Sequence, residues 1–323
     1  MPRETYIDAL KGLAILLVIL AHALQRSLPD IQGNIYFNFI AAFHMPLFMF
    51  LSGYILYLNK AEYDLKWIWK KFLRLIVPFF TWTIIFYYAI DFNFTGLFSF
   101  VDYSGSLLDS ILRTVMHPGN GLWFLWVLFI FYLIAAGVSR SGRPCLFGLF
   151  ILSTLAALAI IGFDLFGMYY IRFHIIFFVA GYAFSMLRVD KEIFLKSKLN
   201  SFGRKYYLAL LPIDWSIALN YTDPAIGLLS KFFYGFAGIS LTWISMSLVL
   251  PKIPKMQQLL SWIGGLTLEI YASHLLFLNT GFGTGYAKAI STSIIALLAS
   301  LILIYSIKNV NILNIILFGS RTR

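Results

Sequence analysis

The sequence predicts an all-α fold, a polytopic transmembrane bundle of about ten helices with both termini cytoplasmic. Of its 323 residues, 60% are hydrophobic and only 12% are charged, which leaves too little polar surface for a soluble domain. Long apolar runs recur throughout, and basic residues fall in alternate connections between them. Each crossing takes about 20 apolar residues, so little length remains for an extramembrane part. We therefore expect one domain over residues 1–323.

Apolar runs place the individual crossings. In chain order they cover residues 8–26, 36–59, 72–90, 122–138, 145–163, 169–187, 206–220, 225–249, 259–279 and 289–308. The first run begins like a secretory leader, but its charged residues Glu4, Asp8 and Lys11 disfavour cleavage, so we expect it to be retained. The seventh contains Pro212 and Asp214 and is compatible with a tilted or re-entrant segment.

The distribution of basic residues sets the orientation. With a cytoplasmic N-terminus, the outer side carries only Arg26, Arg113, Arg172, Lys231 and Lys288, five of the 25 Lys and Arg residues. This asymmetry is the one that the positive-inside rule predicts. The formal net charge of +11 then follows from topology and anionic membrane lipids, and no nucleic-acid partner is expected. A lone Cys145 excludes an internal disulfide and a cysteine metal cluster.

Four histidines lie inside predicted crossings, namely His22, His44, His174 and His274. Each is within about eight residues of an outer helix end, a depth compatible with one shared cavity in the outer leaflet. Ionisable groups in hydrocarbon are costly, so each is a candidate for function, although structural pairs between helices are also common.

The first crossing carries a cation and an imidazole on one face. Lys11 and His22 are eleven positions apart, which is three turns plus about 20°, and about 16 Å along the axis. A path from the cytoplasmic mouth to His22 would suit a substrate that enters from inside. The alternative is that Lys11 extends to the interface and pairs with Asp8.

In the second crossing, Pro46 frees the carbonyl of Ala42, while Ser52 and Gly53 permit close helix approach. We interpret these three residues as structural. His44 needs a polar partner at its depth.

Glu269 lies near the middle of the membrane and must be protonated or paired there. His274 is about 140° around the same helix and is a poor partner. We expect Arg172, His174 and Asp214, in the outer halves of their helices, to be partners for Glu269 and His274.

Two further segments mix charges, aromatic rings and turns. The connection at residues 66–74 contains Trp67, Trp69, Lys70, Lys71 and Arg74, a composition able to hold phosphates and stack a base. Interfacial tryptophans and positive-inside charge would produce the same string. The outer turn at 117–123 ends at Trp123, which with Trp126 offers apolar faces to a sugar or forms part of an aromatic belt.

Together these residues resemble the integral-membrane acyltransferase family 3, particularly its fucose-O-acetylase-like branch. The matching segments are Arg3 to His22 with Asp8, Lys11 and Gly12, then Phe43–Phe48, Leu51–Tyr54, Lys71–Arg74 with Pro78, Leu122–Leu125, and Ile263 to His274. Lys11 and Lys71 depart from the family, in which arginine is usual at these positions, and lysine lacks the bidentate fork for phosphate.

The resemblance implies a membrane O-acyltransferase in the bacterial inner membrane, modifying cell-envelope glycans. The donor would be cytoplasmic acetyl-CoA or another acyl-CoA, the acceptor a hydroxyl of a glycan or lipid-linked sugar at the outer side, and no metal is expected. The resemblance implies His22 as the central catalytic residue, and we expect His44, Glu269 and His274 to act with it because each is an ionisable group inside a predicted crossing. Donor contacts fall to Lys11, Lys70, Lys71 and Arg74, and acceptor contacts to Trp123, Arg172 and His174.

In the implied reaction His22 acts as general base or forms an acyl-imidazole, with His44, His274 or Arg172 orienting it or stabilising charge. A transporter or glycan exporter also uses intramembrane charges and kinked helices, although no inverted repeat is evident. A zinc site built from the outer histidines is the third interpretation, and the acidic ligands that it needs are not aligned with them. The sequence makes no prediction about oligomeric state.

Overall fold

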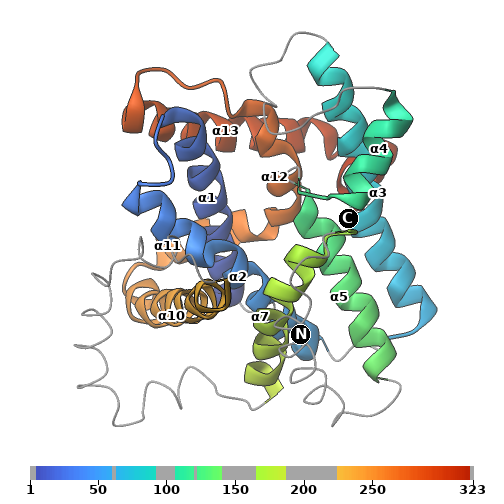
Figure 1. Ribbon diagram of the computed structural model, residues 1–323, viewed down its shortest axis with the longest axis horizontal. Coiled ribbons are helices and arrows are strands. Elements are labelled where there is room, and N and C mark those ends of the chain that lie inside the picture. Colours follow the sequence, from blue (N-terminus) through green and yellow to red (C-terminus); the bar gives the residue numbers. More distant parts are fainter. Residues whose placement is uncertain are drawn as a thin grey trace. The chain divides into compact units, whose positions relative to one another are not determined.

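The computed structural model describes residues 5–59, 63–91, 106–119, 122–139, 165–186 and 224–320. Every regular element within these ranges is a helix, so the predicted all-α fold is confirmed (Figure 1). Six of the described helices are long and apolar enough to cross a membrane, or seven if one broken pair counts as a span. The cytoplasmic placement of both termini stays a prediction.

The described helices are α1 (Thr5–Ser27), α2 (Ile35–Leu58), α3 (Leu65–Asp91), α4 (Leu107–Met116), α5 (Trp123–Ser139), α7 (Met168–Met186), α10 (Pro224–Val249), α11 (Pro254–Gly265), α12 (Thr267–Ser273), α13 (Gly285–Ile307) and α14 (Asn311–Phe318). Two 3₁₀ helices, η3 (Leu250–Lys252) and η4 (His274–Phe277), join this list. The helices α1, α2, α5, α7, α10 and α13 agree with predicted crossings. The predicted crossings 145–163 and 206–220, with Cys145 and Asp214, lie outside the described residues.

One predicted boundary is wrong at the start of α3. We expected residues 66–71 to be a connection, but they are helical because Asp64, the residue just before α3, acts as its N-cap. Its carboxylate accepts a hydrogen bond from the backbone N–H of Trp67 at 2.7 Å, and its carbonyl accepts one from Ile68 at 3.0 Å. Lys70 and Lys71 therefore lie on helix turns, and their positions around the axis are fixed.

The predicted crossing at 259–279 is not one helix. It divides into α11, α12 and η4, with a break at Leu266, whose φ of −108° and ψ of 15° lie outside the helical region. The two residues before the break are Gly264 and Gly265, which have low helix propensity. Sequence reasoning also missed α4 and α14. Both are too short, with 10 and 8 residues, to register as membrane crossings.

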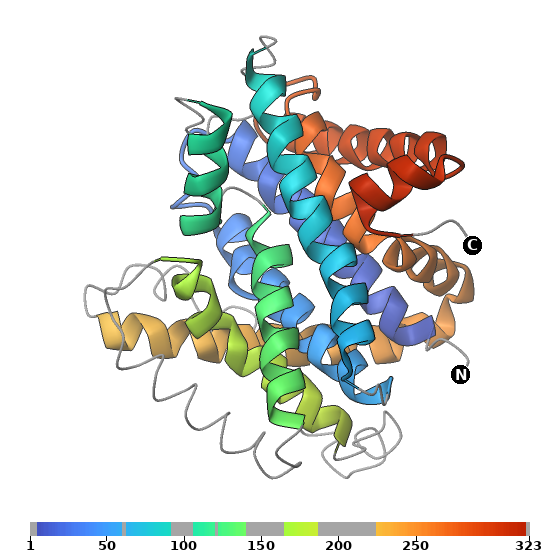
Figure 2. The same ribbon diagram turned by 90° about the vertical axis from the view of Figure 1, so that its right-hand side faces the viewer.

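The chain forms two compact units. The first unit comprises residues 1–60 and 177–265, and the second comprises 61–176 and 266–323. In the first unit α1 packs against α11 and α2, and α2 packs against α10. In the second, α5, α4 and α14 pack against α3, while α12 contacts α13 and α14. Figure 2 shows α5 running alongside α3.

Glycines set the closest helix contacts of the first unit. A β-carbon on Gly12 of α1 would overlap the carbonyl oxygen of Leu260 in α11, and one on Gly264 would overlap that of Asp8. Gly53 of α2 likewise lies against the backbone of Phe178, as its small size predicts. These contacts bring whole backbones together and hold the start of α1, with Asp8 and Lys11, in a fixed position.

Candidate functional site

Two of the predicted catalytic histidines lie on adjoining helices of the first unit. His22 lies on α1, where its side chain is hydrogen-bonded to Gln25 and lies near the charge of Arg26. His44 lies on the adjoining helix α2 and is within electrostatic range of His22. Both side chains are only partly buried. The structure therefore brings together two imidazoles that are neither sealed from their surroundings nor fully exposed.

Backbone carbonyls define the tautomer of His44. Its Nδ1 lies 2.8 Å from the carbonyl oxygen of Ile40, and because a carbonyl only accepts, Nδ1 must carry the hydrogen. In the neutral ring Nε2 then holds the lone pair. The same arrangement occurs at His174, whose Nδ1 donates to Tyr170 at 2.9 Å, and at His274, whose Nδ1 lies 2.8 Å from the carbonyl oxygen of Tyr271. Three predicted site histidines are thus held with Nε2 as the basic nitrogen.

The four histidines are divided between the units. His22 and His44 belong to the first, and His174 and His274 to the second. A single cavity shared by all four stays a prediction.

Lys11 is paired with Asp8, which is the alternative that the sequence offered to a free cation. Its Nζ lies 3.1 Å from the carboxylate of Asp8, one helical turn earlier, and Asp8 is buried. The Lys11 side chain keeps 22% of its surface exposed, so the ammonium is anchored by the pair and still partly accessible. A role for Lys11 toward an acyl donor stays a prediction.

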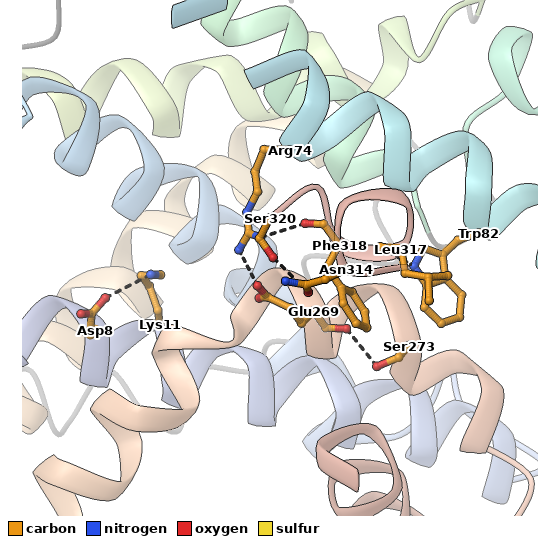
Figure 3. A network of polar contacts seen from close by, with 10 residues as sticks. All are labelled: Asp8, Lys11, Arg74, Trp82, Glu269, Ser273, Asn314, Leu317, Phe318 and Ser320. Carbon is orange, nitrogen blue, oxygen red and sulfur yellow. Dashed lines mark hydrogen bonds and ion pairs between the residues drawn. The ribbon is translucent and has the colours of Figure 1, made fainter. Parts of the chain in front are cut away.

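The second unit contains an ionic centre that joins three helices (Figure 3). The Arg74 guanidinium on α3 donates through Nη2 to Oε1 of Glu269 on α12 at 2.6 Å, and through Nη1 to the carbonyl of Phe318 on α14 at 2.8 Å. The Arg74 side chain is 27% exposed, whereas that of Glu269 is 9% exposed. Among the described residues, none gives a hydrogen bond to the buried Oε2 of Glu269.

This centre corrects the expected surroundings of Glu269. The carboxylate is paired, as its depth required, but the partner is Arg74 and not Arg172 or His174. The third expected neighbour, Asp214, lies outside the described residues. The break before α12 and the packing of α12 and α14 on α3 create this contact. It therefore depends on two features that the apolar pattern did not reveal.

The cations predicted to hold the donor occupy different surroundings. Lys70 is exposed on α3. The Lys71 ammonium lies over two aromatic rings, 5.2 Å from the centroid of Trp67 and 4.4 Å from that of Tyr132. Such cation–π contacts stabilise a lysine within an apolar region. Sequence reasoning missed Tyr132, which lies on α5 and carries no local signal of this contact.

Two of the three residues predicted to bind the acceptor form an aromatic cluster. Trp123 of α5 stacks on Tyr170 of α7 at 4.4 Å between ring centroids, and its ring lies 4.8 Å from that of His174. Arg172 instead lies over Tyr169 at 5.4 Å. Tyr170 was missed, although it lies one helical turn before His174 and bonds its Nδ1. This cluster presents stacked rings next to a polar imidazole.

Across the described ranges, no group of three or more His, Cys, Asp or Glu side chains is placed to hold a metal ion.

Comparison with known proteins adds a family to this geometry. A family model described as an acyltransferase domain matches residues 4–308. The chain is 29% identical to nodulation protein NolL of Sinorhizobium fredii (strain NBRC 101917 / NGR234), over 41% of this chain and 36% of that protein. It is 26% identical to inner membrane protein YcfT of Escherichia coli (strain K12), over 48% of this chain and 49% of that protein.

A second NolL, from Mesorhizobium japonicum (strain LMG 29417 / CECT 9101 / MAFF 303099), is 28% identical over 44% of this chain and 37% of that protein. The matches span between about a third and a half of the length of these relatives. No solved structure matches. The apolar helices and the family match together describe a multi-pass integral membrane protein of the acyltransferase family.

Proposed function

Because the chain belongs to acyltransferase family 3, we propose that it is an acyl-CoA-dependent O-acyltransferase of the bacterial inner membrane. The donor is acetyl-CoA or a related acyl-CoA on the cytoplasmic side. The acceptor is a hydroxyl of a glycan or lipid-linked sugar at the outer side. Two ion pairs on predicted membrane helices, Lys11 with Asp8 and Arg74 with Glu269, support a polar site within an apolar bundle.

The observation that carries this proposal is the placement of two partly buried imidazoles, His22 and His44, on the adjoining helices α1 and α2. In the reaction the acceptor oxygen attacks the thioester carbon, its proton moves to Nε2 or Nδ1 of His22, and the carbon–sulfur bond breaks. The imidazolium then returns the proton to the leaving thiolate, so that the products are an ester and free coenzyme A. A neutral imidazole can accept the first proton near neutral pH, and the imidazolium that it becomes can donate the second.

His44 supports this role by its fixed orientation. Its Nδ1–H is held by Ile40, so its Nε2 can accept a hydrogen bond and orient a neighbouring donor. An acyl-imidazole on His22 is the second route, in which the acyl group passes first to the ring nitrogen and then to the hydroxyl. Both routes require His22 and release the same products.

Within the second unit, taken by itself, Arg74 and an aromatic pair have the chemistry of substrate contacts. Arg74 retains N–H donors beyond the two that bind Glu269 and Phe318, and its partly exposed guanidinium suits a phosphate of the donor. Trp123 and Tyr170 offer stacked aromatic faces of the kind that pack on a sugar, with His174 as a polar neighbour.

The test is acyl transfer in membranes that contain the protein. Membranes supplied with radiolabelled acetyl-CoA should incorporate label into a lipid or polysaccharide fraction, and His22→Ala should abolish that incorporation. His117→Ala is the matched control, because His117 is exposed at the end of α4 and outside the proposed site. Folding of both variants is checked by their melting temperatures. Full transfer by His22→Ala would end the proposal.

Binding of coenzyme A separates this function from export. Purified protein should bind coenzyme A in a calorimetric titration, whereas a simple glycan exporter has no reason to do so. Absence of both binding and transfer in the wild-type protein would contradict an acyl-CoA-dependent enzyme.

A further inference from the structure

The C-terminal end of α14 forms a hook against α3, which we define as residues 317–320. The carbonyl oxygens of its first two residues accept hydrogen bonds from side chains of α3. The indole Nε1 of Trp82 donates to Leu317 at 2.8 Å, and Nη1 of Arg74 donates to Phe318 at 2.8 Å. Carbonyls at a helix C-terminus have no partner within the helix and carry partial negative charge. The hook is therefore suited to hold a cation, and Figure 3 shows it beside the Arg74 guanidinium.

Gly319 gives the hook its shape. Its φ of 61° and ψ of 20° are left-handed, and its N–H closes the end of α14 on Asn314 and Ile315. A β-carbon at this position would overlap the carbonyl oxygen of Leu73 and the α-carbon of Arg74. The turn thus lies directly on the α3 backbone at the residue whose side chain it binds. Ser320 reinforces it by bonding Asn314, 3.2 Å from Oγ to Oδ1.

Arg74 is therefore held from two directions. Glu269 binds Nη2 and the hook binds Nη1, so both ends of the planar fork are fixed. Two of its five N–H donors are used by these contacts, and the side chain keeps 27% of its surface exposed. The remaining donors are presented in a defined plane. A long side chain that is ordered before binding loses less conformational entropy when a ligand arrives.

We propose that the hook is a positioning element for the acyl donor, which acts by fixing the Arg74 guanidinium for an anionic group such as a donor phosphate. The inference rests on the proposed function, because that function supplies the donor. Trp82, Gly319 and the carbonyl of Phe318 are positioning groups in this scheme. Of these groups and Arg74, only Arg74 contacts the ligand.

The first test compares two left-handed glycines. Gly319→Ala and Gly285→Ala impose similar backbone strain, since φ is 61° and 55°, but a β-carbon on Gly285 meets nothing within 4 Å. Only Gly319→Ala should displace the hook. Ordering one side chain is worth about two- to tenfold in affinity, so we expect the dissociation constant of coenzyme A to rise by about that factor in Gly319→Ala and to stay within twofold in Gly285→Ala.

A second variant covers the case in which Gly319→Ala does not fold. Trp82→Phe keeps a buried ring and removes the hydrogen bond to Leu317. It should weaken coenzyme A binding at least about twofold. An unchanged dissociation constant in a folded Gly319→Ala, or failing that in Trp82→Phe, would overturn the proposal.

A double variant distinguishes positioning from general stability. In an Arg74→Ala background Gly319→Ala should cause no further loss of coenzyme A affinity, because the hook acts through Arg74. A merely structural role would lower affinity equally in both backgrounds, and that result would also overturn the proposal. If the wild-type protein binds no coenzyme A, the proposed donor is wrong. If the wild type binds it and the hook variants bind equally well, the hook proposal alone fails.

Discussion

The ion pair between Arg74 and Glu269 makes an unequal contribution to stability, depending on which partner is removed. Arg74→Ala leaves the more buried charge, because the Glu269 side chain is 9% exposed and that of Arg74 is 27% exposed. Breaking a fully buried pair costs about 3–5 kcal/mol, and a charge-assisted hydrogen bond is worth about 1.5–3 kcal/mol. We expect Arg74→Ala to lower the free energy of unfolding by about 3 kcal/mol and Glu269→Ala to lower it by about 2 kcal/mol. The second loss is smaller because the Arg74 guanidinium reaches solvent and still donates a hydrogen bond to the carbonyl of Phe318.

The double variant Arg74→Ala/Glu269→Ala should lose less unfolding free energy than the sum of the losses of the two single variants. Its coupling energy should be about 1.5–3 kcal/mol. The assay is denaturant-induced unfolding of purified protein in one detergent, followed by tryptophan fluorescence. If both single variants lose less than about 0.5 kcal/mol, within the range of ordinary surface substitutions, and the double variant is additive, the pair does not hold α3 and α12 together as described.

Two further predictions concern packing and a helix cap. Gly264→Ala should lower the free energy of unfolding by about 1–3 kcal/mol in the same assay, because the new methyl group meets the backbone of α1. In the control Gly137→Ala in α5, the methyl group meets nothing within 4 Å and should not destabilise the protein. Equal losses in the two variants would contradict this account of packing. The Ser106 hydroxyl and backbone N–H lower the pKa of Asp109 below its ordinary value. The start of α4 is therefore most stable above the ordinary pKa of aspartate, and the protection of its amide hydrogens, measured relative to the intrinsic exchange rate at each pH, should fall as the pH falls through the lowered pKa. Asp109→Asn should lose this pH dependence, and an unchanged profile in the variant would refute it.

The sequence revealed those helices whose apolar runs are long. α1, α2, α10 and α13 follow directly from hydrophobic length, because each can fill a membrane crossing. The break at Leu266 was hidden, since the apolar run continues through it and the glycines before it are tolerated in many membrane helices. α14 was hidden because eight residues are too few to span.

The site was predictable where partners are local. Asp8 and Lys11 are three residues apart, and the sequence offered their ion pair as an alternative. Glu269 was expected to need a partner, but its partner lies 195 residues away, and burial of a charge does not specify which counter-charge meets it. Tyr170 had a usable signal, its spacing of four from His174, that was not applied. Tyr132 had none.

The hydrogen bond from Arg74 to Phe318 is accepted by a main-chain carbonyl oxygen, so it does not depend on the side chain at position 318. Any amino acid at position 318 supplies the same carbonyl oxygen. The choice of side chain there is therefore constrained by packing, which includes the contact with the Trp82 ring. The neighbouring position 319 accepts almost no alternative, because the conformation and the space both require glycine. A saturation scan should therefore accept only large apolar side chains at 318, where the phenyl ring is buried, and only glycine at 319. The bond to Arg74 would itself constrain neither side chain, and packing at 318 and backbone conformation at 319 would set what each position accepts.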